Sequence, residues 1–275
     1  MQAWREDSGV TRGALRIGRR IPNSVQAPPV RPLVAARAIR ALVADPHDTA
    51  QVFVIKGALE GPSLARIYPR FAASRVGQRI AADPDASGEL LERLCDRDYL
   101  RGLPEGSLGR AYLDFLEAAG IEPEGLESAS EAGTPIQDEG LRHLRDRMRN
   151  AHDLLHVVTG YDTDVVGESA VLSFVFAQTG NAAQGLIVLA AFLQARGRMR
   201  HARRTIVRSF LRGRRSAWVL AADWERLLAM PLDEVRRELG LTEVPDYTHV
   251  YPDQVPARRH RLRPGPRSPR LRRRK

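Results

Sequence analysis

Two histidines and two carboxylates stand close together near the middle of the chain. His152, Asp153 and His156 lie within about one helical turn. Glu168 follows His156 after a spacer of eleven residues. Imidazole and carboxylate are the side chains that bind divalent metals such as zinc and ferrous iron. Because residues four apart share a face of a helix, the two histidines can direct their rings at one point. The sequence therefore predicts a divalent-metal site.

The spacing differs from that of the zinc proteases. In their HExxH pattern, a Glu between the two histidines serves as the general base. Here Asp153 follows the first histidine, and no Glu stands between the two. A simpler interpretation is that the histidines are satisfied core residues and that Glu168 is a surface charge. The surroundings favour a metal, because residues 169–195 contain no Asp, Glu, Lys or Arg. A charged cluster at the edge of an apolar block is costly to bury unless it coordinates an ion.

Helical periodicity runs through most of the chain, and no segment shows a convincing alternation with period two. We therefore predict an all-α fold with a single multi-helix domain over residues 29–245. Residues 1–28 are predicted to form a flexible, disordered arm, and residues 246–275 a disordered basic tail. Residues 196–215 are a basic stretch with no assigned element. Helices are expected over 32–44, 48–61, 63–68, 69–81, 87–96, 107–120, 141–158, 183–196, 216–229 and 231–239.

The expected helices explain how the four side chains could meet. A long helix over 141–158 would carry the histidines and Asp153 in its last turns. A turn at Gly160 would follow. Asp164 would then cap a second helix, with Glu168 near its first turn. The metal site is thus predicted to lie between two helices that are consecutive in the chain.

The formal net charge of +10 is concentrated at the C-terminus. Residues 257–275 contain nine Arg, one Lys and no acidic residue, whereas residues 1–256 hold 33 basic and 33 acidic residues. Such a tail can bind anionic lipid or nucleic acid, or it can be solvated and dispensable. Residues 1–256 show neither a basic face nor interleaved aromatics. We therefore predict no nucleic-acid partner.

The uncharged block is the strongest candidate for a membrane segment. Its middle, residues 178–185, reads QTGNAAQG. This divides the block into apolar runs at 170–177 and 186–193, each shorter than the ~20 residues that a spanning helix needs. We expect two buried or membrane-facing helices and no crossing. Cys95 is the single cysteine, so no internal disulfide is possible.

The motif and its surroundings resemble the ubiquinone (coenzyme Q) biosynthesis protein 4 family. The marker of that family is His-Asp-x-x-His, eleven residues and then Glu, and the four residues described above match it fully. At Leu155 many members carry an aromatic residue, which changes packing and no predicted ligand. The resemblance covers about residues 30–240. Further matching segments are ADPHDTAQVF (44–53), LPEGSLGRAYLDFL (103–116), RDRMRNAHDLLHVVTGY (145–161) and WERLLAMPLDEVRRELG (224–240).

The resemblance implies an all-helical protein that acts at a membrane surface on polyprenylated ring precursors of ubiquinone. The implied reaction is a metal-dependent oxidative decarboxylation, in which a hydroxyl replaces the carboxyl at ring carbon 1 of a 4-hydroxybenzoate-type precursor. Zinc has no redox chemistry, so such a reaction favours iron or another redox metal over zinc. The implied partners are the precursor, other ubiquinone biosynthesis enzymes, the membrane surface and a second copy in a homodimer. For a bacterial protein, the implied location is cytoplasmic, peripheral on the inner face of the membrane. The implied metal ligands are His152, Asp153, His156 and Glu168.

Three roles leave alternatives open. Asp153 could bind the metal directly or could orient His156 or a bound water. We favour direct ligation, because four protein ligands match the preference of such metals. Arg149, one turn before His152, is a candidate catalytic residue that could pair with the substrate carboxylate, or it could be a solvent-facing charge. Tyr161 could touch the substrate ring or pack in the core.

Two functions compete. One is a metal-dependent enzyme, a decarboxylase or lyase, with Arg149 and Asp153 in its active site. The other is a non-catalytic, lipid-binding scaffold that organises the biosynthetic complex and holds a purely structural metal. The apolar runs 170–177 and 186–193 could line a groove for the polyprenyl tail, although ordinary helix–helix packing explains them equally well.

Overall fold

The computed structural model describes residues 25–45, 48, 50–83, 86, 88–120, 135–196 and 199–251. Within these ranges every regular element is helical, which confirms the predicted all-α fold. The elements are α1 (Pro32–Ala44), α2 (Ala50–Leu59), α3 (Gly61–Ala72), α4 (Arg75–Ala82), α5 (Glu89–Cys95), α6 (Arg97–Gly102), α7 (Leu108–Ala119), α9 (Glu139–Asn150), α10 (His152–Thr159), α11 (Val165–Thr179), α12 (Ala182–Gln194), α13 (Arg200–Arg215), the 3₁₀ turn η3 (Val219–Ala221), α14 (Trp224–Leu227) and α15 (Leu232–Leu239).

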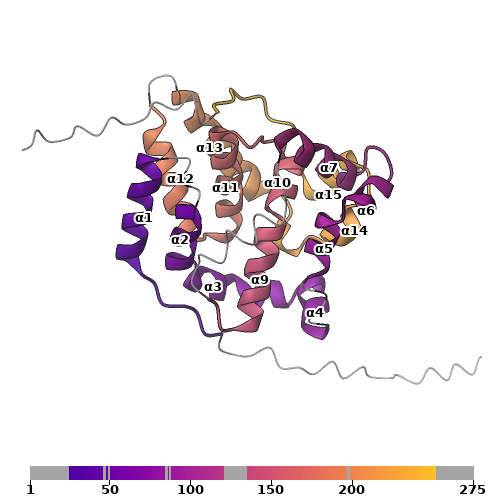
Figure 1. Cartoon of the computed structure of the whole chain (residues 1–275), viewed down its shortest axis with the longest axis horizontal. Coiled ribbons are helices and arrows are strands. Elements are labelled where there is room, and N and C mark those ends of the chain that lie inside the picture. The colour runs from indigo at the N-terminus through magenta and orange to yellow at the C-terminus, as the bar shows by residue number, and fades with distance from the viewer. Residues whose placement is uncertain are drawn as a thin grey trace, which may run out of the picture.

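The helices form two groups around a central set (Figure 1). At one end, α1, α2 and α12 pack on one another. At the other end lie α5, α6, α7, α14 and α15. Between them run α9, α10, α11 and α13. The largest buried apolar cluster spans the central and second groups, and a smaller one, centred on Ile55 and Ile187, joins α1, α2 and α12. The predicted metal-binding residues therefore lie on the central helices.

Several helix ends follow the predicted local chemistry. The Ser107 hydroxyl accepts a hydrogen bond from the Arg110 amide and caps α7, which ends at Gly120 in the left-handed conformation. Asp164 caps α11 by accepting from the Val166 amide at 3.0 Å. The glycine that ends α10, Gly160, has φ +75°. These residues fix where the connection between α10 and α11 begins and ends.

The predicted single helix over 141–158 is wrong. The structure contains two helices, which meet at Ala151, where φ is −81° and ψ is −3°. The segment around Ala151 contains neither Gly nor Pro, so no local signal marks the break. The eight-residue helix α10 is too short to be stable alone and depends on its neighbours. Arg236 donates to the carbonyls of Val157 and Val158 at its C-terminal end, at 3.0 and 3.2 Å.

Three other assignments differ from the structure. The predicted division at Pro69 is absent, since α3 continues through this exposed residue, where water can satisfy the unpaired carbonyl. Instead of a helix over 216–229, the chain forms η3 and α14. Gln178 explains part of this difference, because its side chain accepts from the Val219 amide at 3.0 Å and donates to the Ala217 carbonyl at 2.7 Å. The unassigned basic stretch forms α13.

Helix α13 holds α11 in place through a close, parallel contact. The Ser209 hydroxyl donates to the Ala170 carbonyl at 2.6 Å. A Cβ on Gly213 would lie 2.4 Å from the Phe174 carbonyl oxygen. From the first contact to the second, the position moves four residues toward the C-terminus on both helices. The two helices therefore run in the same direction. Small residues allow the backbones to approach closely, and α11 gains a rigid support on the side away from Glu168.

A buried ion cluster joins the central helices to the second group. Arg147 on α9 donates to both carboxylate oxygens of Glu225, at 2.7 and 3.0 Å, and to the Ala222 carbonyl at 2.8 Å. Arg79 on α4 contacts Glu225 at 2.8 Å and Asp223 at 3.0 Å. Burial would raise the pKa of Glu225, but the hydrogen bonds and charge of Arg147, with Arg79, lower it to about 2. The cluster is therefore fully charged and internally paired.

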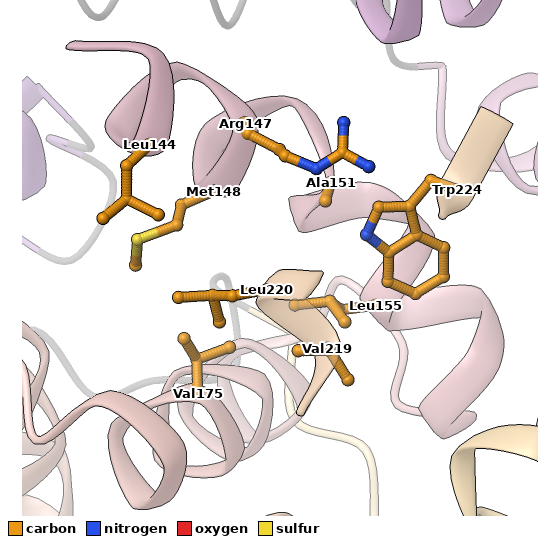
Figure 2. Close-up of a pocket in the computed structure, with 9 residues that line it drawn as sticks. All are labelled: Leu144, Arg147, Met148, Ala151, Leu155, Val175, Val219, Leu220 and Trp224. Carbon is orange, nitrogen blue, oxygen red and sulfur yellow. The ribbon is translucent and has the colours of Figure 1, made fainter. Parts of the chain in front are cut away.

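A small cavity of about 20 Å³ lies beside this cluster (Figure 2). It has room for about one water molecule or methyl group, and not for an aromatic ring. Leu155 of α10 points into it, opposite Val175 and near Trp224. The lining residues are Leu144, Arg147, Met148, Ala151, Leu155, Val175, Val219, Leu220 and Trp224.

Two expectations about the ends and the membrane can be compared with the described residues. No described helix has the length and apolar character that crossing a membrane requires, as expected for the block 169–195. Residues 246–251, which were assigned to the tail, lie against α11. Residues 1–24 and 252–275 lie outside the described residues.

Candidate metal centre

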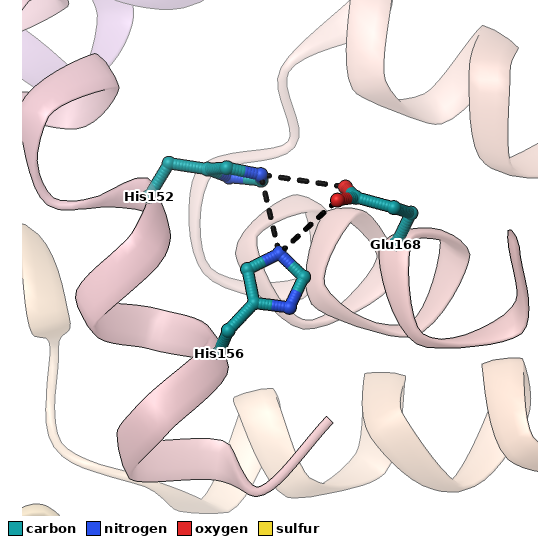
Figure 3. Close-up of side chains that lie close together, drawn as sticks. All are labelled: His152, His156 and Glu168. Atoms are coloured by element: carbon teal, nitrogen blue, oxygen red, sulfur yellow. Dashed lines mark hydrogen bonds and ion pairs between the residues drawn. The ribbon is translucent and has the colours of Figure 1, made fainter. Parts of the chain in front are cut away.

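Three of the four predicted ligands meet between α10 and α11 (Figure 3). The Nε2 atoms of His152 and His156 are 3.4 Å apart. The Glu168 carboxylate reaches across from α11, with Oε2 3.4 Å from His152 Nε2 and Oε1 3.4 Å from His156 Nε2. The two imidazole rings stand at 83° to each other. The sequence spacing thus brings three side chains into a triangle, in which each histidine nitrogen faces the other and a different oxygen of the Glu168 carboxylate.

The tautomer of His156 is fixed by the backbone. Its Nδ1 lies 3.0 Å from the Tyr161 carbonyl oxygen. A carbonyl can only accept, so Nδ1 carries a proton, and Nε2 is the atom that faces the triangle and would offer its lone pair to a metal ion. The Phe115 ring stacks on the same imidazole at 5.7 Å. A ligating histidine ordinarily donates its other N–H to such a partner, which orients the ring.

The electrostatics of the triangle favour a negatively charged Glu168. Burial would raise the pKa of this carboxyl, but hydrogen bonds and charge from His152 and His156 hold it well below its usual range. Burial lowers the pKa of His156, and the hydrogen bond that its ring donates to Glu168, with the charge of that carboxylate, more than compensates, so the net shift is upward. Glu168 is therefore an anion across the neutral range, and a cation at this point would meet a full negative charge.

The triangle has the dimensions of a metal site. Ligand atoms at ~2.0–2.1 Å from a tetrahedral ion lie about 3.3–3.4 Å from one another. Here the Nε2–Nε2 distance is 3.4 Å, and each Nε2 lies 3.4 Å from one of the two Glu168 oxygens. Two neutral imidazoles and one carboxylate also match the donor preference of zinc and ferrous iron. The three residues could therefore hold a divalent ion and leave a further coordination position open.

Access to that position lies on the side of His152 and Glu168. Their side chains are 25% and 41% exposed, whereas that of His156 is 1% exposed. One ligand is thus anchored in the core, and the other two form the rim. A small molecule could approach the ion from this rim, which is the arrangement of a catalytic rather than a closed structural metal site.

Asp153 lies beside the triangle and not in it. Its side chain on α10 is buried, and burial raises the pKa of its carboxyl, while His152 and His156 act to lower it. The group of mutually close donor atoms contains the other three predicted ligands only. Direct ligation by Asp153 stays a prediction, and the alternative of an orienting role fits its buried position.

Arg149 is not solvent-facing, because its side chain is 11% exposed. It contacts Asp146 at 3.3 Å and donates to the side-chain oxygen of Asn150 at 3.1 Å. It precedes His152 by three residues, across the break at Ala151. Its predicted role with a substrate carboxylate stays a prediction.

Tyr161 is 2% exposed, as the packing alternative requires. Its ring lies between the Tyr247 ring and the Arg212 guanidinium. Its hydroxyl has no hydrogen-bond partner among the described residues. The backbone carbonyl of Tyr161 holds His156, a contribution that the side-chain pattern could not reveal.

A second group of possible donors was missed in the sequence. Asp162, Asp164 and His249 lie close together, with His249 Nδ1 3.2 Å from Asp164 Oδ2. Both oxygens of Asp164 already accept hydrogen bonds, from the amides of Val166 and Val250 and from a tyrosine hydroxyl. Three acceptor positions of Asp164 are thus occupied by hydrogen bonds within the protein, and His249 lies beside the remaining one, so the group is held together without an ion. His249 lies 85 residues after Asp164 in the chain, and only the capping role of Asp164 was visible in the sequence.

Comparison with known proteins places the chain in a family. The model of the family described as coenzyme Q (ubiquinone) biosynthesis protein Coq4 matches residues 26–245. The mitochondrial ubiquinone biosynthesis protein COQ4 of Meyerozyma guilliermondii is 31% identical over 188 residues, which are 67% of this chain and 58% of that protein. The COQ4 homolog of Bos taurus is 35% identical over 179 residues, 61% of this chain and 64% of that protein. The chain thus spans about three fifths of the length of these relatives.

A solved structure supports the fold. The crystal structure of a putative ubiquinone biosynthesis protein from Nostoc punctiforme superposes with a TM-score of 0.56 at 20% sequence identity. It covers 78% of this chain and 100% of its own. With the family model matching most of the chain, the assignment is direct: this protein belongs to the coenzyme Q (ubiquinone) biosynthesis protein Coq4 family.

Proposed function

We propose that this protein is a metal-dependent enzyme of ubiquinone biosynthesis, acting at a membrane surface on a polyprenylated 4-hydroxybenzoate-type precursor. The reaction is an oxidative decarboxylation at ring carbon 1. The ring carboxyl leaves as carbon dioxide, and a hydroxyl takes its place. Water supplies the hydroxyl oxygen, and dioxygen accepts the two electrons and two protons that the conversion releases and becomes hydrogen peroxide, so that acid, water and dioxygen give phenol, carbon dioxide and hydrogen peroxide.

The observation that carries this proposal is the half-open triangle of His152, His156 and Glu168. A bound divalent ion would stabilise negative charge on the phenolate or carboxylate of the ring, and iron would add redox chemistry. The protein's own contribution is to hold the three donors in place. His156 keeps its Nδ1 proton on the Tyr161 carbonyl, so its Nε2 stays available.

Two further residues are assigned to the head group. Asp153 is proposed to bind the ion directly or to orient His156 from its buried position. Arg149 is proposed to pair with the substrate carboxylate. It would have to exchange Asp146 for the substrate, because it contacts that carboxylate at 3.3 Å. An Arg–carboxylate pair is directional and would place carbon 1 toward the triangle.

The proposed membrane surface is the exposed side of α12 and α13, which pack on each other. Leu189 and Leu193 of α12 are 52% and 50% exposed, and Val207 and Leu211 of α13 are 48% and 44% exposed. Exposed arginines flank the α13 pair, and α13 has no acidic residue. Apolar side chains surrounded by arginines suit an anionic lipid surface. The run 186–193 is thus partly exposed, as a lipid-facing helix requires, whereas the run 170–177 is mostly buried core.

The enzymatic proposal is tested by turnover of a soluble, short-chain polyprenyl 4-hydroxybenzoate under air with ferrous iron. The parent protein is expected to release carbon dioxide and form the hydroxylated ring in equal amounts. His156→Ala removes the anchored ligand and is expected to reduce this turnover at least about 100-fold. Circular dichroism would show that the variant retains its helices.

The rival proposal, a lipid-binding scaffold with a structural metal, predicts a different result. The parent would show no turnover at any iron concentration, and His156→Ala would still restore ubiquinone synthesis in a strain that lacks its own copy of this protein. Partnership with other biosynthetic enzymes and a homodimer are compatible with either function and are part of the proposal.

The membrane surface is tested by vesicle flotation of the full chain. Anionic vesicles of phosphatidylglycerol are expected to carry the protein upward, and phosphatidylcholine vesicles to carry less. Leu189→Asp with Leu193→Asp should abolish flotation. The matched control is Val244→Asp, a change at a 57% exposed apolar residue outside α12 and α13, which should float like the parent.

A further inference from the structure

The segment after α15 lies along the connection between the two helices that carry the metal ligands. We name residues 241–251 the C-terminal brace. The Tyr247 hydroxyl accepts a hydrogen bond from the Asp162 amide at 2.8 Å and donates one to Asp164 Oδ2 at 2.6 Å. Burial, and then the hydrogen bond to Asp164, raise the pKa of Tyr247 well above its usual range, so the hydroxyl keeps the proton that it donates. A single hydroxyl thus ties two points of the connection together.

The C-terminal brace also completes the first turn of α11. Asp164 Oδ1 accepts from the Val166 amide at 3.0 Å and from the Val250 amide at 2.9 Å. The Val165 amide, which an isolated helix would leave unpaired, donates to the Val250 carbonyl at 2.9 Å. His249 adds a contact to Asp164 from the exposed side. The N-terminus of α11 is therefore built from two segments of the chain.

This turn leads directly to Glu168. The Glu168 amide donates to the Asp164 carbonyl at 2.8 Å. At the preceding residue, Gly167, a Cβ would lie 2.0 Å from the Asp162 carbonyl oxygen and 2.8 Å from the Tyr247 hydroxyl. Such close contacts mean that a shift of the Tyr247 hydroxyl must be accommodated by the backbone next to Glu168.

The other end of the C-terminal brace is fixed to α10. Arg212 donates to the Thr159 carbonyl at 3.0 Å and to the Glu243 carbonyl at 2.6 Å. The brace therefore connects the last turn of α10 with the first turn of α11. His156 lies in the former turn and Glu168 in the latter. The 3.4 Å separation of their donor atoms depends on how these two turns are held.

We propose that Tyr247 is a positioning residue for the metal centre, which holds the first turn of α11 so that the Glu168 carboxylate lies at ligand distance from both histidines. This inference rests on the proposed function only in taking His152, His156 and Glu168 as metal ligands. Tyr247 acts through Asp164 and the helix, and touches neither ion nor substrate.

The test uses Co²⁺ as the probe, titrated into the metal-free full chain. Visible absorption of Co²⁺ reports the geometry of its ligands, and competition with a chelator reports its affinity. Tyr247→Phe keeps the ring and removes the hydroxyl. We expect Co²⁺ to bind about tenfold more weakly, with a changed visible spectrum. Tenfold is the lower end of the loss in metal affinity that follows when a residue that orients a ligand is removed.

The matched control is Tyr99→Phe, which removes another part-buried hydroxyl whose partner is Arg93, at 3.4 Å, outside the metal centre. Whatever thermal stability this control loses, it should bind Co²⁺ like the parent. His249→Ala provides a second variant of the brace, since its side chain is 45% exposed and its loss is compatible with folding. We expect it to change the spectrum in the same direction by a smaller amount.

Parent-like affinity and spectrum in folded Tyr247→Phe would overturn the positioning role and reduce the brace to a contributor to stability. If Tyr247→Phe does not fold, parent-like binding by His249→Ala would overturn it in the same way. A parent protein that binds no Co²⁺ would overturn the metal centre, and the positioning role with it. These results are distinguishable, because the first two leave metal binding by the parent intact.

Discussion

Two clusters of charged and titratable side chains lie in this molecule, and they differ in completeness. In the cluster of Arg147, Arg79 and Glu225, cations surround a buried carboxylate, and every charge has a partner. In the triangle of His152, His156 and Glu168, three acceptors of a cation face one another and open to solvent on one side. The first cluster needs nothing further. The second has the geometry of a site that something else completes.

The difference shows how structural and functional polar clusters can be distinguished. A buried ion pair costs desolvation and is tolerated only with full pairing. Both oxygens of Glu225 meet guanidinium groups, and the Arg147 side chain is 4% exposed. The triangle keeps a 41% exposed carboxylate at its rim. Removal of a residue should therefore affect folding in the first cluster and metal binding in the second.

The largest expected effect is on metal affinity. Glu168→Gln preserves the size of the side chain and removes the charge that a cation would meet. We expect Zn²⁺ affinity, measured by chelator competition, to fall more than about 100-fold. Removing a residue that only orients a ligand lowers metal affinity about 10- to 100-fold, and removing a ligand itself should lower it further. The free energy of unfolding should change by less than about 1 kcal/mol. Unchanged affinity would remove the distinction between the two clusters.

Arg147→Met should have the opposite pattern. It leaves the Glu225 carboxylate buried with only Arg79 as a cationic partner, and breaking such a pair costs about 3–5 kcal/mol. Urea unfolding measures this loss. Zn²⁺ affinity of the folded fraction should match that of the parent. A destabilisation below about 1 kcal/mol would show that the cluster is not the structural element inferred here.

Acid should reveal the same cluster. The pKa of Glu225 is about 2 in the folded protein against a usual value of 4.5. Because the folded pKa is depressed, the stabilisation is fully present above about pH 4.5 and is lost as pH falls through this range toward 2. The difference corresponds to about 3 kcal/mol. Unfolding measured between pH 6 and 3 should become less pH-dependent in Glu225→Gln, and an identical slope in both proteins would count against this assignment.

The smallest effect concerns the cavity beside the first cluster. In Leu155→Phe the ring would replace a side chain that already lines this cavity, so only its added volume must fit the roughly 20 Å³, and we expect the free energy of unfolding to rise by about 0.5 kcal/mol. Leu155 lines this cavity and is not one of the three donor residues, so Co²⁺ absorption should not change. A loss of more than about 1 kcal/mol would mean that the surrounding helices cannot accommodate the ring.

Local sequence patterns predicted much of the fold and three of the converging donors. The spacing of His152 and His156 sets both on one helical face, and Asp164 marks the start of the helix that brings Glu168 to them. These features depend on residues near one another in the chain. The family resemblance identified the same four residues without showing which of them would meet.

Features that depend on distant residues could not be predicted in this way. The break at Ala151 has no local signal. Helix α13 was not predicted because arginines dominate its sequence, although one face carries small residues such as Ser209 and Gly213. The C-terminal brace was assigned to a tail, although Tyr247 contacts Asp164 across 83 positions of the chain. In each case tertiary contacts supply the partners that the segment lacks by itself.

The most direct test of the metal centre is the metal content of the purified full chain, measured by elemental mass spectrometry beside the His152→Ala/Glu168→Ala double variant. About one equivalent of iron or zinc in the parent, absent from a double variant with the same helical circular dichroism, is the result we predict. Equal metal content in both proteins, or none in either after reconstitution with Fe²⁺ or Zn²⁺, would contradict the assignment of this triangle as a metal site.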